Sequence, residues 1–192
     1  MSGSNQFRII GGEWRGRKLQ FPDVAAIRPT PDRVRETLFN WLQPYILGAS
    51  CLDLFAGSGA LGLEALSRGA ASATFVEQQS LAAVMIREHL KRLNGNGSVV
   101  ERDALSYLKQ EGQSIPFDLV FLDPPFGMGL IAEVSRQLDD GDLIHDKTII
   151  YLESEQPVMD EALPSGFHIE REKRAGQVWY GLAKFNSDKR QS

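Results

Sequence analysis

The stretch Ser50–Gly62, SCLDLFAGSGALG, decides the fold, because an apolar run leads here into a glycine-rich turn and then into a helix. The apolar run predicts a buried strand. Gly57 and Gly59 allow the backbone to turn tightly and to approach a ligand closely, with the amino end of the next helix behind the turn. Such a unit is typical of a parallel sheet that binds its ligand beyond the carboxyl ends of the strands.

The rest of the chain repeats this alternation of strands and helices. We predict strands at about 50–55, 72–77, 97–102, 117–122 and 147–153, and helices at about 58–68, 79–93, 103–110 and 128–138. The ending differs, because Gly166–Arg171 and Gln177–Phe185 predict two strands joined around Gly176, an antiparallel hairpin that closes the sheet. The pattern indicates an α/β fold with helices on both faces of a mostly parallel sheet.

The strand predicted at 117–122 ends in a second informative motif, Asp123-Pro124-Pro125-Phe126. Each proline fixes its own φ near about −65° and lacks an N–H, so the strand cannot continue. The carbonyls of Asp123 and Pro124 stay free to accept hydrogen bonds. Phe126 offers a ring on which a flat, polar substrate could stack. A plain Pro-Pro stop with Phe126 in the core is the alternative that the motif alone leaves open.

The glycine turn also matches a motif of another class of protein. Gly57, Gly59 and Gly62 fit the G-x-G-x-x-G pattern of dinucleotide-binding proteins. Glu77 follows 18 residues after Gly59, where it could bind a ribose diol. However, Asp53 before the turn would repel a pyrophosphate, and a dinucleotide fingerprint does not predict the Asp-Pro-Pro-Phe motif. A ligand with a ribose but no phosphates therefore fits the pattern better.

The acidic and aromatic residues near the turn each have a purely structural alternative. Glu77 could be an exposed acid at a strand end, and Asp103, after the strand at 97–102, could cap a helix. Phe55 could belong to the core. Because Glu77 and Asp103 follow successive strands, we expect both at one ligand site.

Composition indicates one globular domain. The chain has 192 residues, of which 42% are hydrophobic and 24% charged. It has no apolar run long enough to cross a membrane and no apolar signal-peptide core at its start, so we expect a cytoplasmic protein. Cys51 is the only cysteine, and His89, His145 and His168 are isolated from one another in the sequence. We therefore expect no metal site.

Basic residues are concentrated near the N-terminus. Residues 1–35 carry a net charge of +4, whereas the rest of the chain carries −8. The segment Ile9–Leu19 predicts a β-hairpin with Trp14 and three basic residues, Arg15, Arg17 and Lys18, around its turn. Basic and aromatic side chains on an exposed loop suit RNA. Two alternatives are a solvated charged face and a Trp14 side chain that packs inward, away from RNA.

A helix is predicted to follow the hairpin. Thr30 can cap it, Pro31 fits its first position, and apolar residues recur on one face until Pro44 ends it. Three arginines lie before or off this face and are expected to be free for solvent or a ligand: Arg28, Arg33 and Arg35. We divide the single domain into three segments: a hairpin and helix at 1–45, a core at 50–185 and a tail at 186–192.

Two motifs resemble those of a known superfamily. Asp53–Gly62 resembles the first motif of Rossmann-like S-adenosylmethionine methyltransferases, and Asp123-Pro124-Pro125-Phe126 is similar to the (D/N/S)PP(Y/F/W) motif of the branch that methylates amino nitrogens. The resemblance implies a three-layer fold with a mostly parallel seven-stranded sheet, and S-adenosylmethionine as the cofactor. The cofactor contacts that it implies, with Glu77 at the ribose and Asp103-Ala104 at the adenine, are Asp53, Phe55, Ala56, Gly57, Ser58, Gly59, Glu77, Gln78, Asp103 and Ala104.

The chain is more narrowly similar to the RsmD-type guanine-N2 methyltransferases of small-subunit ribosomal RNA. This likeness rests on seven segments: Arg8–Gly12, Trp14–Leu19, Arg28–Thr30, Asp32–Phe39, Leu61–Arg68, Arg171–Lys173 and Ala175–Val178. It implies a guanine of 16S ribosomal RNA as substrate and favours the assembled 30S particle over naked RNA. We take a monomer as the default, and the expected chemistry needs no metal. We expect RNA contacts at Arg15, Arg17, Lys18, Arg28, Arg33 and Arg35. Methylation of DNA adenine N6 or protein glutamine, and RNA binding without catalysis, are the alternatives.

The four-residue motif implies a way of activating the amino group. A guanine N2 is a poor nucleophile because its lone pair is delocalised into the ring. The Asp123 carboxylate and the Pro124 carbonyl can accept its N–H bonds and bind the cationic transition state more tightly than the ground state. Pro125 would keep this ledge rigid, and Phe126 would stack on the base. The sequence leaves open whether Asp123 also takes the released proton.

Overall fold

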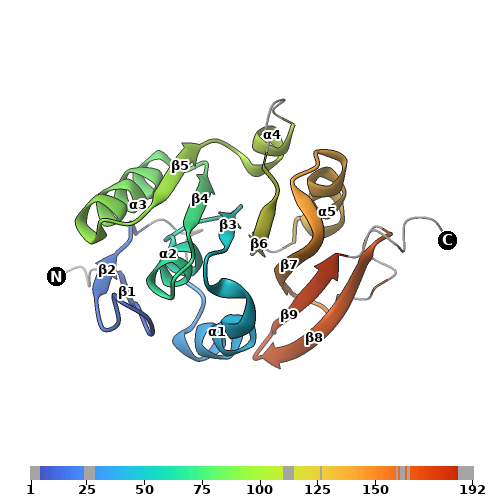
Figure 1. Ribbon diagram of the computed structural model, residues 1–192, viewed down its shortest axis with the longest axis horizontal. Helices are drawn as coiled ribbons and strands as arrows, with labels where there is room; N and C mark the ends of the chain where they lie inside the picture. Colours follow the sequence, from blue (N-terminus) through green and yellow to red (C-terminus); the bar gives the residue numbers. More distant parts are fainter. Residues whose placement is uncertain are drawn as a thin grey trace.

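A seven-stranded sheet forms the centre of the structure, a computed structural model that describes residues 5–23, 29–109, 115–125, 127–158, 160, 163 and 165–185 (Figure 1). The strand order is β5-β4-β3-β6-β7-β9-β8. The bounds are β3 Ser50–Asp53, β4 Ser72–Glu77, β5 Gly97–Glu101, β6 Phe117–Leu122, β7 Ile144–Ser154, β8 Phe167–Ala175 and β9 Val178–Phe185. Neighbouring strands from β5 to β7 are parallel, and β9 is antiparallel to both β7 and β8. The predicted fold class is confirmed.

Helices cover both faces of this sheet. On one face lie α1 Asp32–Ile46, α2 Ala60–Ser67 and α3 Ser80–Leu93, and on the other lie α4 Ala104–Leu108 and α5 Leu130–Asp140. Adjacent residues of β3 point to opposite faces, so Cys51 joins the first cluster of buried side chains and Leu52 the second. Burial on both faces explains why the central strands read as continuous apolar runs.

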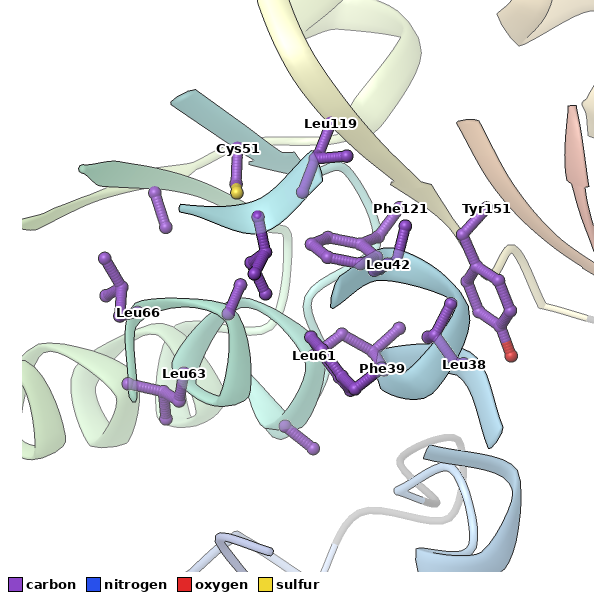
Figure 2. Close-up of a cluster of buried hydrophobic side chains, with 14 of the residues drawn as sticks. Leu38, Phe39, Leu42, Cys51, Leu61, Leu63, Leu66, Leu119, Phe121 and Tyr151 are labelled. Atoms are coloured by element: carbon purple, nitrogen blue, oxygen red, sulfur yellow. The ribbon is translucent and has the colours of Figure 1, made fainter. Parts of the chain in front are cut away.

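The cluster under α1 and α2 is built from interlocking apolar side chains (Figure 2). The Phe39 ring of α1 packs against Phe121 of β6 with centroids 6.2 Å apart, and Phe121 meets Tyr151 of β7 edge-on at 6.4 Å. Leu38 and Phe39 are essentially inaccessible to solvent, and burying each such side chain stabilises the fold by about 1.5–3 kcal/mol. This packing fixes α1 across the strands whose carboxyl ends carry the functional motifs.

Helix α1 differs from its prediction at both ends. Pro31 precedes the first helical residue, and no side chain caps the helix, so Thr30 does not have the predicted role. Pro44 lies inside the helix, which ends at Ile46. A proline in the last turn removes only the bond to the carbonyl of Asn40, and Asn40 is exposed, so water can replace that donor.

The N-terminal hairpin is a separate two-stranded sheet that docks on α2. Strands β1 Gln6–Arg8 and β2 Lys18–Gln20 pair antiparallel. Their loop is held by Ser67 of α2, whose carbonyl accepts the Glu13 N–H at 2.7 Å and whose hydroxyl donates to the Gly11 carbonyl at 2.6 Å. A Cβ on Gly12 would lie 1.7 Å from the Ser67 carbonyl oxygen, so only glycine permits this contact.

Trp14 does not have the exposed position that the sequence analysis predicted. Its side chain is only 8% exposed and belongs to the buried cluster, where its ring lies against Gly95. The Trp14 N–H donates to the Ser67 hydroxyl at 2.9 Å, which turns the loop toward α2. Trp14 is therefore a core residue that anchors the hairpin. Among the described helices, none is long and apolar enough to cross a membrane.

Candidate functional site

A cavity of about 720 Å³ lies at the carboxyl ends of the parallel strands. It is at the point where the chain order reverses between β3 and β6, the position where open α/β sheets bind ligands. Of the ten residues predicted to contact a cofactor, all except Gly59 line this cavity. Asp123, Pro124 and Pro125 line it as well. Phe126 lies outside the described residues. The structure thus brings the glycine turn and the Asp-Pro-Pro motif to one site.

The glycine turn has the backbone conformation that its sequence predicts. Gly57 and Gly59 have φ values of +53° and +76°, in the left-handed region that favours glycine. The Gly57 N–H donates to Glu77 at 2.7 Å, so the acid at the end of β4 holds the turn. Gly59 instead faces α3, where an added Cβ would lie 3.0 Å from Ile86. Its contribution is therefore close packing behind the cavity rather than a lining surface.

Asp53 lies beneath the turn and is only 2% exposed. Its carboxylate accepts the Gly62 N–H at 3.0 Å, which uses one of the free donors at the amino end of α2. Burial raises the pKa of Asp53 to about 7, and the charge of Glu77 adds to the rise. An acid below the turn and another beside it disfavour a pyrophosphate. They suit a ligand that carries positive charge.

Glu77 and Asp103 form hydrogen bonds within the protein and also line the cavity. The Glu77 carboxylate accepts the N–H groups of Gly57 and Gln79, and burial is the main cause that raises its pKa. Asp103 caps α4 by accepting the Ser106 N–H at 2.9 Å. Each carboxylate oxygen has two lone pairs, so both acids keep acceptor capacity toward the cavity. The structural and the ligand-binding interpretations of these residues are compatible.

The Asp-Pro-Pro ledge stands at the end of β6. Pro124 is buried and Pro125 is exposed. Burial raises the pKa of Asp123 well above its usual range, and the charges of Glu153 and Asp53 raise it further. A hydrogen bond from the Thr30 hydroxyl opposes this rise. The ledge therefore places a carboxyl group of unusually high proton affinity at the wall of the cavity.

Two further cavity residues, Thr30 and Glu153, were missed in the sequence analysis. Glu153 lies on β7, and the register of β7 with β6 pairs Leu152 with Leu122. Glu153 and Asp123 are the next residues of the two chain segments, so they lie side by side. It is 5% exposed and accepts the Tyr151 hydroxyl at 2.6 Å. The rule that acids at the ends of parallel strands share a site would have found Glu153. Thr30 carried no such signal, because before Pro31 it resembles an ordinary helix cap.

The basic residues predicted to meet RNA fall into separate groups. Arg15, Arg17 and Lys18 are exposed on the hairpin. Arg33 is exposed in the first turn of α1, close in sequence to Pro31, which lines the cavity. Arg28 lies outside the described residues. The hairpin loop docks at the carboxyl end of α2, whereas the amino end of α2 reaches the cavity.

The prediction that Arg35 is free for solvent or a ligand is wrong. Its side chain is fully buried, and it donates to the carbonyls of Thr30 at 3.1 Å and Arg8 at 2.8 Å. It also pairs with Asp32 at 2.5 Å and with the buried Glu64 at 3.5 Å. Helical spacing placed Arg35 off the apolar face, but the hairpin packs over that position. Arg35 therefore joins the hairpin, α1 and α2.

Comparison with known proteins gives a consistent set of relatives. The family model described as "Conserved hypothetical protein 95" matches residues 7–184. The chain is 52% identical over 182 residues to Ribosomal RNA small subunit methyltransferase D of Escherichia coli (strain K12), covering 94% of this chain and 91% of the relative. Among solved structures, a putative methyltransferase, yhhF, from Escherichia coli superposes with a TM-score of 0.85 at 50% identity, covering 95% of this chain and 99% of that one.

A more distant structure shows how widely the fold is shared. SMU.776, a putative methyltransferase complexed with SAH, superposes with a TM-score of 0.72 at 15% identity, covering 96% of this chain and 57% of that chain. At this identity the likeness concerns the fold alone. The arrangement of strands and helices around the cavity is thus one that also occurs in a methyltransferase of much lower sequence similarity.

Proposed function

The chain belongs to the family described as conserved hypothetical protein 95, the RsmD family, and we propose that it methylates the exocyclic N2 amino group of a guanine in 16S ribosomal RNA, with S-adenosylmethionine as the methyl donor. One observation carries the proposal: the glycine turn and the Asp-Pro-Pro ledge line the same cavity at the switch point of the sheet. The family relationship supplies the substrate class. The ledge offers hydrogen-bond acceptors that suit a substrate amino group.

The cavity fits S-adenosylmethionine in size and in the chemistry of its walls. A volume of about 720 Å³ lies within the usual range for a small-molecule site. Gly57 lets the backbone approach the ligand, Glu77 would accept the ribose hydroxyls, and Asp103 with Ala104 would hold the adenine. When bound, the cofactor supplies an electrophilic methyl group on a positively charged sulfur. Asp53 and Glu77 are acids on that side of the cavity, and a bound cation would favour their ionised forms.

The ledge would activate the amino nitrogen through hydrogen bonding. The Asp123 carboxylate and the Pro124 carbonyl accept the two N–H bonds, which favours the pyramidal nitrogen with a localised lone pair. Both interactions strengthen as the nitrogen becomes cationic, so they stabilise the transition state more than the ground state. Pro125 fixes the backbone of the ledge, and Phe126 stacks on the base. Positioning of the two reactants accounts for much of the remaining acceleration.

The RNA would approach from the side of the N-terminal segment. Methylation at N2 requires a guanine that is unpaired or extruded into the cavity. Arg33 stands near the cavity, whereas Arg15 and Arg17 are separated from it by the length of α2, about 12 Å for its eight residues. We therefore assign Arg33 to phosphates near the target guanine and the hairpin to more distant RNA of the 30S particle.

A methyl-transfer assay tests the substrate. Radiolabelled S-adenosylmethionine is offered with deproteinised 16S ribosomal RNA, 30S subunits, DNA and protein, and the product is digested to nucleosides. We expect N2-methylguanosine, formed faster on 30S subunits than on naked RNA. Label in N6-methyladenine or in protein would favour the alternative substrates. RNA binding without any transfer would show a noncatalytic module.

The variant Asp123→Ala tests the ledge. We expect normal cofactor affinity by calorimetry and a loss of methyl transfer of at least about 100-fold, because an acceptor made in the transition state is removed. Asp146→Ala, which removes an exposed acid at the amino end of β7, serves as the matched control and should retain full activity. Near-normal turnover of Asp123→Ala would exclude this carboxylate from the mechanism.

The hairpin is tested by a triple substitution to alanine at Arg15, Arg17 and Lys18. We expect weaker RNA binding and a salt-dependence slope that is smaller by about 2–3, since each lost phosphate contact contributes about 0.7–0.9. A control triple substitution to alanine at Lys109, Arg136 and Lys147 removes the same charge elsewhere on the exposed surface. Equal RNA affinity and slope in the two triple variants would contradict the assignment.

A further inference from the structure

Four side chains connect the ledge to the interior of the sheet. Asp123 and Glu153 follow paired residues of β6 and β7 and line the cavity together with Thr30, whose hydroxyl is within interaction range of both carboxyl groups. The Tyr151 hydroxyl donates to Glu153 at 2.6 Å. Thr30, Tyr151 and Glu153 are all buried, and Thr30, Asp123 and Glu153 line the cavity. A continuous line of hydrogen-bonding groups therefore runs from the cavity wall to Tyr151.

Counting the hydrogens that these four side chains can donate indicates how many protons the two carboxyl groups hold. Thr30 and Tyr151 each have one hydroxyl proton. If both carboxyls were ionised, Thr30 could donate to only one of them, and its lone pair would face the other. With one proton shared by the two acids, every contact has a donor. The proton can lie on Asp123, which then donates to Thr30, or on Glu153, which reverses the direction of both Thr30 hydrogen bonds.

We propose that Asp123 and Glu153 share a single proton, which moves through the Thr30 hydroxyl to Glu153 when a substrate amino group binds Asp123. This inference rests on the proposed function. Without substrate the proton lies on Asp123, because ionised Glu153 then accepts two hydrogen bonds, from Tyr151 and from Thr30. An amino group that donates to Asp123 favours its ionised form, and Glu153 takes the proton. Glu153 and Thr30 are thus positioning residues that act through Asp123.

The surroundings of the pair favour such a shared proton. Asp53 faces it from β3, Tyr151 from β7 and Tyr180 from β9, and these groups are acidic or neutral. Among the described residues, Arg35 is a cation in contact with Thr30, and it binds the backbone carbonyl of that residue. Burial raises the pKa of both Asp123 and Glu153. Two neighbouring carboxyls in such a place titrate as a coupled pair.

With one shared proton at the start, every bond and proton of the methyl transfer can be followed. An N–C bond forms as the S–C bond of the methyl donor breaks, which leaves a thioether and a cationic amino nitrogen. That nitrogen loses its proton to the Asp123 carboxylate, so both acids are then protonated. One proton leaves to solvent when the methylated RNA dissociates, and the single shared proton remains. No oxidant, reductant or further reactant is needed.

Infrared spectroscopy of the free protein tests the sharing without any need for activity. At pH 8.5 we expect the stretching band of one protonated carboxyl, because Asp53, with a pKa of about 7, is then ionised. The pH at which the band disappears should be lower in both Asp123→Asn and Glu153→Gln, since each variant removes the neighbouring acid that helps to hold the proton. Glu133→Gln, which changes an acid whose side chain is 44% exposed and lies outside the cavity, should leave the band and its pH dependence unchanged. A band that disappears at the same pH in Glu153→Gln and in the wild type would overturn the proposal.

Single-turnover kinetics on 30S subunits test the relay. Glu153→Gln should move the acidic limb of the pH–rate profile at least one pH unit lower, because the neighbouring acid that helps to hold the proton on Asp123 is gone. Thr30→Val should slow methyl transfer by about tenfold or more, whereas Thr30→Ser stays within about threefold, both with wild-type cofactor affinity. Equal rates for Thr30→Val and Thr30→Ser, or an unmoved profile, would refute the relay. A wild-type protein that shows the infrared band but methylates no RNA would refute only the proposed function.

Discussion

Arg35 offers a sharp test of how the N-terminal segment is attached. Arg35 and Arg136 each lie on a helix and each pair with two acids, but Arg35 is fully buried whereas 53% of the Arg136 side chain is exposed. We predict that Arg35→Met destabilises the fold severely and that Arg136→Met hardly changes it. The two variants remove the same group and replace it with the same side chain, so the difference measures the effect of burial.

The expected loss of stability in Arg35→Met follows from the contacts of Arg35. Methionine would remove its hydrogen bonds to the carbonyls of Thr30 and Arg8 and its charge beside the buried Glu64. Loss of one partner of a buried pair typically costs about 3–5 kcal/mol. Glu64 retains Arg68 at 2.7 Å, which places the expected loss near the lower end, about 3 kcal/mol. An exposed pair such as that of Arg136 contributes about 0–1 kcal/mol.

Urea unfolding, followed by tryptophan fluorescence, gives the free energy of unfolding of both variants. Wild-type slopes with a lower midpoint for Arg35→Met would show a change in stability alone. If this variant does not fold, Arg35→Lys keeps the charge but not the planar fork and should lose about 1–2 kcal/mol. A free energy of unfolding for Arg35→Met within about 1 kcal/mol of that for Arg136→Met would refute the reasoning.

Two other predictions concern backbone geometry and pH. Gly12→Ala should lower the free energy of unfolding by more than about 2 kcal/mol and release the hairpin, because the added Cβ would lie 1.7 Å from the Ser67 carbonyl oxygen. Gly16 has φ +84° and open space around it, so Gly16→Ala should lower the free energy of unfolding only by the backbone strain, about 1–2 kcal/mol. Equal melting temperatures of the two variants would count against this. In the folded protein Asp53 holds its proton up to a pH of about 7, whereas in the unfolded chain it does so only to about 4. The free energy of unfolding should therefore fall as pH rises between these values. The expected fall is as much as about 4 kcal/mol relative to Asp53→Asn. A wild-type-minus-variant difference that is equal at pH 5 and pH 8 would exclude the shift.

The core of the fold was predictable because local pattern and burial agree there. The strands at 72–77 and 117–122 have the predicted bounds. In a sheet that is covered on both faces, a strand is apolar along its whole length, so its ends coincide with the ends of the apolar run. β7 begins at Ile144, before the predicted 147, because the polar residues His145–Lys147 hide its start. Strand ends also indicated the site, since the topology of a parallel sheet brings them to one edge.

Burial of polar and aromatic residues in the N-terminal segment was not predictable from local pattern. Arg35 and Trp14 look like surface residues when only their own helix or loop is considered. Their partners, Glu64 and Ser67, lie on α2 and are distant in the sequence. Sequence patterns report the face that an element buries against the main core, but they do not report a second element that packs on the outer face.

This second packing layer links the N-terminal segment to the chemistry of the cavity. Glu64 accepts the N–H groups of Ile10 and Gly11 and pairs with Arg35, and Arg35 in turn holds the carbonyl of Thr30. The Thr30 hydroxyl is within interaction range of the Asp123 carboxyl on the ledge and of the Glu153 carboxyl on β7. The basic N-terminal segment therefore combines exposed side chains, which we propose contact RNA, with a buried arginine that holds a cavity residue. Arg35→Met should accordingly slow methyl transfer at saturating RNA, whereas loss of the exposed hairpin charges should be overcome by more RNA.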